Sequence, residues 1–395
     1  MIKSILKGSI LMLTTFSIAA HAQDDLVKKA YNANDSARKF KFTTVLNLEN
    51  TPVKNQGSSG TCWSYATNSF LESEMARMGR QPVEIAQIYT ARCVYQDKAE
   101  NYLRMGGNAG WGDGGECHDV INMYAKYGAM PQSAYTGLMY GAKKNQFAEM
   151  QAILKGMLDA LVKNPNGKIS PGWRQAFNGV LDAYLGPVPE TFTWNGKTYT
   201  PRTFADQVIG INPADYVELT SYTFAPYYEK TMLWAPDNWS YDMAYNVKMN
   251  DITDIIDYAL KNGYSVSWAT DVSEKYFSWK NGVAFVPEKE YEDMSEDEIK
   301  NMWNGPQKER VITPEMRQAG LDNFSTTDDH GMHIIGLAKD QNGADYYIVK
   351  NSWGTKNDYK GYLYVSKPFV QLKTTGFLLH KGGIPPALRK KLKLG

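Results

Sequence analysis

The order of helical and strand-like segments along the chain predicts an α+β fold. Helix-compatible runs occupy residues 62–78, 83–104, 116–127, 139–163 and 251–261. Runs rich in β-branched and aromatic residues predict strands later in the chain, at 264–270, 333–338, 346–350 and 361–365. Because helices come first and strands follow without βαβ alternation, we expect a helical lobe and a separate β-rich lobe.

The composition limits the classes of function. Of the 395 residues, 43% are hydrophobic and 22% are charged, which supplies a core and excludes a disordered chain. The net charge is +1, so no global basic field favours nucleic acid, and no nucleic-acid partner is expected. The basic run at 389–393 is interpreted as a solvated tail or helix face, with a polyanion contact as the alternative.

The first 22 residues have the features of a signal peptide. Lys3 and Lys7 precede an apolar stretch at 10–20, and Ala20-His21-Ala22 fits the small-x-small cleavage rule. The apolar stretch is too short for a good membrane span, so we expect no membrane anchor. The sequence therefore predicts an exported protein, periplasmic or extracellular, that begins at Gln23.

The remaining chain is predicted to form one folded domain at 46–395, after a flexible polar leader at 23–45. Between about 137 and 245, Pro- and Gly-rich breaks and aromatic, strand-like pieces such as 191–199 replace the earlier regular pattern. This stretch carries no motif with catalytic chemistry. We interpret it as a central insertion or an elaborated lobe.

The segment Gln56-Gly-Ser-Ser-Gly-Thr-Cys62-Trp63 carries the strongest chemical signal. A cysteine that begins a helical run lies where backbone N–H groups and the helix dipole favour the thiolate. Gln56 lies six residues upstream, and its amide could donate to a developing oxyanion together with the Cys62 N–H. The alternative is a buried structural cysteine at the start of a helix.

A nucleophilic cysteine needs a base, and His330 is the best-placed candidate. It opens the run His-Gly-Met-His-Ile-Ile-Gly, in which strand alternation points His330 and His333 to opposite faces. His330 stands at the mouth of that strand, whereas His333 lies within it. His118 follows Cys117 in a predicted helix without metal-ligand spacing, so a structural or surface role is expected, and no metal site is predicted.

Asn351, in the run Asn351-Ser-Trp353-Gly that follows the strand at 346–350, is a candidate to orient that histidine. Its side-chain oxygen can accept a hydrogen bond from the imidazole N–H that faces away from the sulfur, which fixes the tautomer. Trp353 could shield this bond from water. Alone, this run could be a turn. It indicates a catalytic role because it follows the candidate cysteine and histidine, in the order Cys, His, Asn.

Together these segments resemble the papain-like (C1) cysteine peptidases. Gln56, Cys62-Trp63, His330 and Asn351-Ser-Trp353-Gly match that family's oxyanion, nucleophile, base and orienting positions, and Gly336 stands six residues after His330 as is common there. Asp113-Gly114-Gly115 resembles the family's Asn-Gly-Gly loop, whose backbone pairs with an extended peptide. The resemblance implies a two-lobed fold with the substrate cleft between a helical lobe and an antiparallel β-rich lobe.

Within the family, the closer likeness is to the bleomycin hydrolase and aminopeptidase C branch. The run Ser58-Ser59-Gly60-Thr61 before Cys62, and Gly-Met after His330, point to that branch. The span of 268 residues from Cys62 to His330 exceeds the roughly 130–150 of papain and cathepsins, and the central insertion accounts for the excess. The likeness leaves a homo-oligomer open.

The C-terminal segment keeps two kinds of cleavage open. Residues 384–392 resemble the helix before a C-terminal tail that, in this branch, restricts cleavage to the substrate's N-terminus, and the chain stops at Gly395. Both an aminopeptidase and an endopeptidase therefore stay as expectations.

The resemblance implies hydrolysis of peptides through a thioester acyl-enzyme, without metal or organic cofactor. A Cys-His acyltransferase or a non-catalytic peptide-binding descendant are the alternatives from other classes.

The three cysteines are Cys62, Cys93 and Cys117. An odd count in an oxidising compartment suggests one pair and one reactive thiol. If Cys62 is the reactive thiol, Cys93 and Cys117 are the candidate disulfide, flanking the glycine loop at 106–115. The alternative is two buried thiols, because spacing does not reveal the separation of the Cα atoms.

Overall fold

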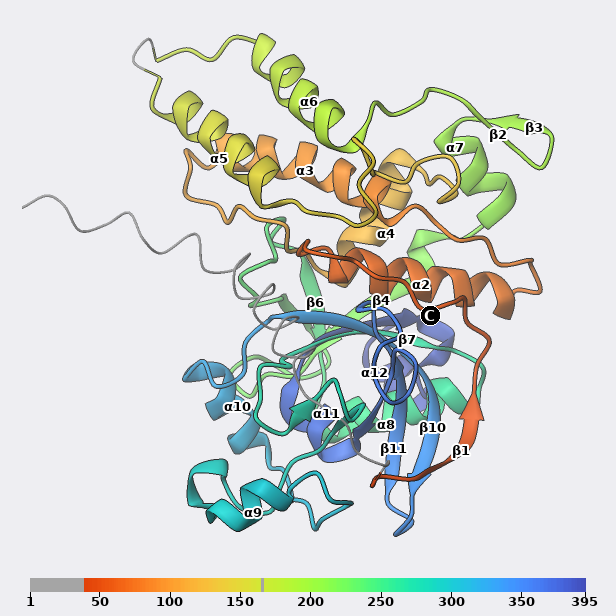
Figure 1. The fold of residues 1–395 in the computed structure, drawn as a ribbon, viewed down its shortest axis with the longest axis vertical. Coiled ribbons are helices and arrows are strands. Elements are labelled where there is room, and N and C mark those ends of the chain that lie inside the picture. The colour runs from red at the N-terminus through yellow and green to blue at the C-terminus, as the bar shows by residue number, and fades with distance from the viewer. Residues whose placement is uncertain (1–38, 165–166) are drawn as a thin grey trace, which may run out of the picture.

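A helical lobe and a β-rich lobe meet along helix α2 (Cys62–Arg77) in the computed structural model, which describes residues 39–164 and 167–395 (Figure 1). The expected signal peptide at 1–22 lies outside the described residues, as does most of the expected leader.

The helical lobe groups helices around one apolar core. Its further helices are α3 (Gln87–Arg104), α4 (Cys117–Tyr127), α5 (Ala148–Val162), α6 (Gly172–Leu185) and the short α7 (Pro201–Phe204). In Figure 1, α6 lies on the far side of α3 from the sheet, and α5 packs against both α3 and α6.

Helix α2 is buried on all sides, which explains its lack of an amphipathic stripe. Small polar side chains of α2 form hydrogen bonds with the elements on both of its sides. Thr67 Oγ1 lies 2.8 Å from Ser267 Oγ on the sheet side, and Ser64 Oγ donates to the carbonyl of Gln87 at 2.8 Å on the side of α3. Small residues thus let backbone elements of the two lobes approach closely at the first turns of α2.

A mixed sheet forms the second lobe. Its strands are β1 (Phe42–Asn47), β4 (Tyr216–Thr220), β5 (Lys230–Met232), β6 (Met243–Asn246), β7 (Val266–Thr270), β8 (Phe277–Ser278), β9 (Val283–Ala284), β10 (His330–Asp340), β11 (Asp345–Lys350), β12 (Tyr362–Ser366) and β13 (Thr374–His380). Their order is β5-β6-β4-β13-β7-β10-β11-β12-β9-β8, with β1 beside β10. Neighbours are antiparallel except for the pairs β4–β6 and β9–β12.

Two helices cover opposite faces of the sheet. His333 of β10 faces α2, whereas its neighbours Met332 and Ile334 pack in the core shared with α8 (Met249–Lys261). The other helices of this lobe are α9 (Glu296–Asn301), α10 (Pro314–Asp322), α11 (Lys367–Lys373) and α12 (Pro386–Lys391). Among the described residues, no helix combines the length and the apolar character needed to cross a membrane.

The expected boundary of the leader at residue 45 is wrong, because β1 begins at Phe42 and pairs antiparallel with β10. The Phe42 ring stacks on Tyr364 with the ring centroids 3.9 Å apart. Gly336 of β10 pairs with Asn47 of β1, and a Cβ at this glycine would come within 2.3 Å of the Leu46 carbonyl oxygen. A glycine is therefore required at this position by the close approach of β1.

The central stretch at 137–245 elaborates both lobes. Its first half supplies α5 and α6, and strands β4 to β6 extend the sheet of the other lobe. Between them lies a hairpin of β2 (Phe192–Trp194) and β3 (Lys197–Tyr199). Asn195 and Gly196 link its strands with φ of 46° and 74°, the conformation that two-residue hairpin turns require.

Candidate active site

Cys62 is the first residue of α2, and its side chain is 7% exposed. Thr61 precedes the helix without a side-chain cap, so the N–H groups of the first turn are directed toward the space in front of the cysteine. This is the location that the sequence predicted, and the positive end of the helix dipole favours a thiolate there.

The strand that carries His330 packs directly against this helix start. A Cβ added to Gly331 would lie 3.1 Å from the Cα of Trp63 and 3.4 Å from the carbonyl carbon of Cys62. No other residue type leaves room for this approach without movement. His330, the first residue of β10, is thereby held beside the first turn of α2.

Asn351 is hydrogen-bonded to Nε2 of His330. The Nε2–H donates to Asn351 Oδ1 at 2.7 Å, which leaves Nδ1 as the nitrogen that can accept a thiol proton. Asn351 follows β11, and its Oδ1 also accepts the Ser352 N–H at 2.7 Å. Burial lowers the pKa of His330 to about 4, while the hydrogen bond with Asn351 acts in the opposite direction. The imidazole is therefore neutral at pH 7 and can act as a base.

Trp353 covers this pair, as the sequence predicted. Its ring centroid lies 4.5 Å from that of His330, and Trp279 packs behind it at 5.4 Å. Trp353 is 2% exposed, so the His330–Asn351 bond is kept from water.

Gln56 is fully buried on the loop before Cys62, and its amide is fixed at both ends. Ser352 Oγ donates to Gln56 Oε1 at 2.6 Å, and Gln56 Nε2 donates to the Ser59 carbonyl at 2.7 Å. One hydrogen of Nε2 remains for another acceptor. The contact with Ser352 links the loop of the nucleophile to the residue after Asn351.

The glycine loop at 113–115 packs on Trp63. Trp63 Nε1 donates to the Asp113 carbonyl at 2.9 Å, and the Asp113 carboxylate accepts the Gly60 N–H at 3.0 Å. A Cβ at Gly115 would lie 2.9 Å from the Trp63 ring. Gly115 thus packs on Trp63, the residue after Cys62, and the role of Gly114 and Gly115 in binding substrate stays a prediction. Sequence analysis missed that the Asp113 side chain ties this loop to Gly60.

The expected disulfide between Cys93 and Cys117 is wrong, since none of the cysteines is in a disulfide. Cys93 lies on α3 beside Tyr89, and burial raises the pKa of its thiol to about 12. Cys117 begins α4 and accepts a hydrogen bond from Ser267 Oγ of β7 at 3.2 Å. The two thiols face different neighbours, so the alternative of two buried thiols holds.

The other histidines that sequence analysis weighed have structural partners. His333 Nδ1 lies 3.0 Å from Ser69 Oγ of α2. His118 pairs through Nδ1 with Glu218 of β4. Burial lowers the pKa of His118, but the charges of Glu218, Asp119 and Asp242 and the hydrogen bond with Glu218 together raise it to about 9. Among the described residues, no cluster of His, Cys, Asp or Glu has the arrangement to hold a metal ion.

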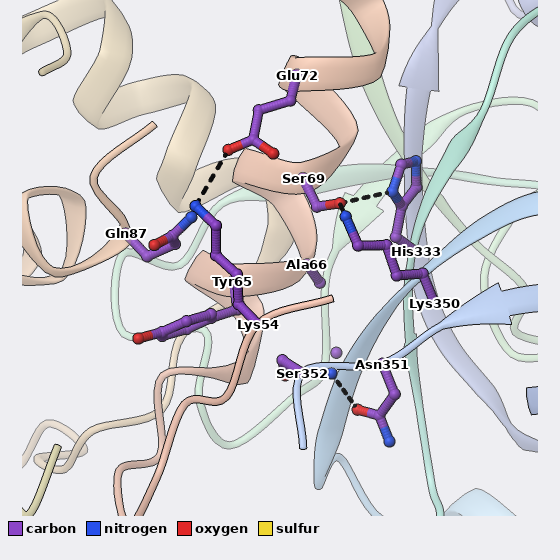
Figure 2. A pocket seen from close by; sticks show the side chains of 11 residues that line it. Lys54, Tyr65, Ala66, Ser69, Glu72, Gln87, His333, Lys350, Asn351 and Ser352 are labelled. Carbon is purple, nitrogen blue, oxygen red and sulfur yellow. Dashed lines mark hydrogen bonds and ion pairs between the residues drawn. The ribbon is translucent and has the colours of Figure 1, made fainter. Parts of the chain in front are cut away.

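Figure 2 shows a buried polar network behind Asn351. It surrounds a cavity of about 10 Å³, near the space of one water molecule. Lys350 Nζ donates to Ser69 Oγ at 2.8 Å, and burial lowers its pKa to about 8. Lys54 faces Glu72 across the same space at 3.6 Å. The network joins the strand end that carries Asn351 to α2.

Comparisons with known proteins cover both halves of the chain. Residues 179–393 match the model of the Peptidase C1-like family, and residues 40–163 match that of the papain family of cysteine proteases. Aminopeptidase G of Lactobacillus delbrueckii subsp. lactis is 24% identical over 92% of this chain and 88% of its own length. Aminopeptidase C of Streptococcus thermophilus is 23% identical over 89% of this chain and 85% of its own.

A yeast protein and a solved structure are also similar to this chain. Cysteine proteinase 1, mitochondrial, of Saccharomyces cerevisiae is 23% identical over 95% of this chain and 86% of its own. The crystal structure of PepW from Lactobacillus rhamnosis is 20% identical, covers 98% of this chain and 96% of that one, and has a TM-score of 0.69. The predicted α+β, papain-like fold is confirmed.

Proposed function

Since the chain belongs to the Peptidase C1-like family, we propose that it hydrolyses peptide bonds through Cys62, His330 and Asn351. The likeness to the bleomycin hydrolase and aminopeptidase C branch is confirmed, and the chain is a cysteine peptidase acting on peptides or proteins. One observation supports these three residues above others: the 2.7 Å bond from His330 to Asn351, on a strand packed against the first turn of α2.

In the proposed mechanism, the Cys62 thiol proton passes to Nδ1 of His330 as Sγ attacks the carbonyl carbon. Asn351 holds the ring and stabilises the imidazolium through the Nε2–H bond. The second Nε2 hydrogen of Gln56 and the Cys62 N–H stabilise the oxyanion. His330 then gives its proton to the leaving amine as the C–N bond breaks, and water hydrolyses the thioester to restore the thiol.

We propose further that cleavage occurs near the substrate's N-terminus. The relatives named aminopeptidases favour this reading, and so does the segment at 221–242, between β4 and β6. Its Asp237 carboxylate lies so close to Gly114 that a Cβ there would overlap it. Trp239 Nε1 of the same segment donates to Asp119 Oδ2 at 3.0 Å. This segment packs on the glycine loop, and we propose that it limits the number of substrate residues before the scissile bond.

The expected export stays part of the proposal, on the signal-like features of residues 1–22. Mass spectrometry of the secreted fraction should find Gln23 at the N-terminus. An uncleaved chain kept in the cytoplasm would contradict export. Homo-oligomerisation is proposed on the branch likeness alone, and light scattering of the mature protein would measure it.

The test of the activity compares the mature protein with Cys62→Ala on N-blocked and free-amine fluorogenic peptides under reducing conditions. We expect the substitution to lower kcat/KM by at least about 10⁴-fold, because the nucleophile is lost. Cleavage of free-amine peptides alone supports an aminopeptidase, and cleavage of blocked peptides as well supports an endopeptidase. Peptide hydrolysis that Cys62→Ala retains would overturn the proposed role of Cys62.

A further inference from the structure

Asn145 has no part in the mechanism above, yet its side chain contacts the loop that carries Gln56. It belongs to the central stretch at 137–245, lies three residues before α5 and is 4% exposed. Its Nδ2 donates to the main-chain carbonyl of Gln56 at 3.2 Å and to Tyr65 Oη at 2.9 Å. Tyr65 lies three residues after Cys62 in α2. One amide group therefore connects the Gln56 loop with the helix that begins at the nucleophile.

The main chain around Asn145 pairs with the same loop. The Ser58 N–H donates to the Asn145 carbonyl at 2.9 Å, and the Phe147 N–H donates to the Ser58 carbonyl at 3.1 Å. These two bonds form a short parallel bridge between Ser58 and Gln146. Next to it, Gly57 has a φ of 66°, and a Cβ there would lie 2.7 Å from the Asn145 carbonyl oxygen. A glycine is required at this position because the two segments approach so closely.

The packing of its neighbours fixes the place of Asn145. The Phe147 side chain is 3% exposed and lies against Tyr95 of α3, with the ring centroids 6.5 Å apart. Burial raises the pKa of Tyr65 to about 12, so its hydroxyl is neutral at pH 7 and accepts the hydrogen bond from Asn145. The core of the helical lobe, and not the catalytic loop, therefore holds this asparagine in place.

The two donors proposed for the oxyanion stand on different elements. Nε2 of Gln56 belongs to the loop, and the N–H of Cys62 belongs to the start of α2. An oxyanion is stabilised best when both donors lie within hydrogen-bond distance of the same oxygen, so their separation matters. Ser59 and Ser352 hold Gln56 to its own loop and to the segment after β11. The bridge through Asn145 adds a connection to α2 itself.

We propose that Asn145 is a positioning residue for the oxyanion site, which sets the distance between Gln56 and the start of α2. The inference rests on the proposed peptidase function and adds a residue from the central stretch, in which sequence analysis found no catalytic motif. Asn145 does not touch the reacting atoms, because it binds the main chain of Gln56 and the hydroxyl of Tyr65. It acts through the Gln56 side chain, whose direction follows from the main chain that carries it.

Kinetics of Asn145→Ala in the full chain give the first test, with a peptide that the unmodified enzyme cleaves. We expect kcat to fall about tenfold and KM to stay within about twofold, because the oxyanion forms only after substrate has bound. Asn301→Ala, at an exposed asparagine of α9, is the matched control and should retain full kcat. An unchanged kcat in folded Asn145→Ala would overturn the proposal.

Tyr65→Phe serves if Asn145→Ala does not fold. It keeps the buried ring and removes only the hydroxyl by which Asn145 contacts α2. We expect kcat to fall about threefold with KM unchanged, a smaller loss because Asn145 still contacts Gln56. A kcat equal to that of the unmodified chain would show that the bridge to α2 has no effect on the oxyanion site, and this would overturn the proposal.

A double-mutant cycle with Gln56→Ala distinguishes positioning from a general loss of structure. In the Gln56→Ala background, Asn145→Ala should lower kcat by no more than about twofold, because the donor that Asn145 orients is already absent. Equal losses in both backgrounds would show a structural role that is independent of Gln56, and the proposal would be wrong.

Binding of a peptide aldehyde measures the oxyanion site without turnover. The Cys62 sulfur forms a bond with the aldehyde carbon as the C=O π bond opens, and the thiol proton ends on the former carbonyl oxygen, which the two donors then bind. We expect Asn145→Ala to weaken this binding about tenfold and to leave the affinity for the matching peptide alcohol unchanged. Iodoacetamide, which alkylates Cys62 without forming an oxyanion, should react at the unmodified rate. Slower alkylation would place the effect on the nucleophile and would overturn the proposal.

These measurements also separate the positioning role from the proposed function. Suppose that the unmodified enzyme shows no Cys62-dependent hydrolysis, but that the aldehyde affinity falls in Asn145→Ala. The proposed activity is then removed, and the positioning role stands. If hydrolysis depends on Cys62 and the aldehyde affinity is unchanged in Asn145→Ala, the activity stands and the positioning role is removed.

Discussion

The catalytic side of the groove and its acidic side are organised differently. At the catalytic side, hydrogen bonds hold the groups before any substrate is present: His330 to Asn351 at 2.7 Å, and Ser352 to Gln56 at 2.6 Å. At the acidic side, formed by Glu116 and Asp328, burial raises the pKa of both carboxyl groups, and Thr375 Oγ1 lies 3.5 Å from Asp328 Oδ1. Preorganised groups lower a barrier, whereas buried acids cost free energy of folding when they are charged. The contrast separates a region held in place by hydrogen bonds from a region whose charged state is disfavoured by burial.

Apart from removal of the nucleophile, Asn351→Ala is expected to lower catalytic activity the most. We expect kcat/KM to fall by about 10–100-fold, because a misplaced imidazole loses its alignment with Cys62. The hydrogen bond with Asn351 raises the pKa of His330, so the acid limb of the kcat/KM profile should move to lower pH. Asn342→Ala, in an exposed turn, is the control. A normal rate with an unmoved profile would show that Asn351 does not position the histidine.

A smaller effect is expected from Gly331→Ala, which tests the contact between β10 and α2. The new Cβ would lie 3.1 Å from the Cα of Trp63, and this backbone cannot give way without moving the helix start. We expect kcat/KM to fall about tenfold and the free energy of unfolding to fall by about 1–3 kcal/mol. Gly179→Ala, on an exposed position of α6 with open space around it, should retain full activity. Equal behaviour of the two variants would refute the close-packing argument.

The smallest expected effect concerns the acidic side, and it is an increase in the free energy of unfolding. Burial raises the pKa of Asp328 in the folded chain to about 6 from 3.8. Its stability contribution is therefore fully present below pH 3.8 and is lost as the pH rises through 6. Asp328→Asn should raise the free energy of unfolding by about 1 kcal/mol at pH 8 and by little at pH 4. Urea denaturation at both pH values measures this, and a loss of stability at pH 8 would contradict a carboxylate that burial destabilises.

The sequence correctly predicted the position of a residue on its helix or strand where neighbouring residues in the chain determine that position. Cys62 at a helix start, His330 at a strand mouth and Asn351 after a strand all lie where their neighbours in the chain indicated. Helix starts were less accurate: α3 was expected from residue 83 and begins at Gln87, because Ile85 instead forms a bridge with Pro131. Strand β1 was missed because its run of six residues is short, does not alternate between apolar and polar residues and is mostly exposed, and pairing with β10 stabilises it.

The acidic side could not be predicted, because its residues come from distant parts of the chain. Glu116, Glu218 and Asp328 are about 100 residues apart from one to the next, and each stands in an unremarkable local pattern. Asp237 lies in the central stretch, where no motif drew attention. Only the fold brings these side chains together, so sequence patterns that act over a few residues carry no signal for them.

Strand β1 sets a limit on proteolytic maturation. The first half of β10, from His330 to Ile334, has β7 as its neighbour, and the second half, from Gly336 to Asp340, has β1 instead. A cut before Phe42 leaves this arrangement complete. A cut beyond Asn47 would release the segment that flanks half of the strand carrying His330. Trimming of the leader and loss of the active site are thus separated by only a few peptide bonds, and proteases that process this chain must stop before the sheet begins.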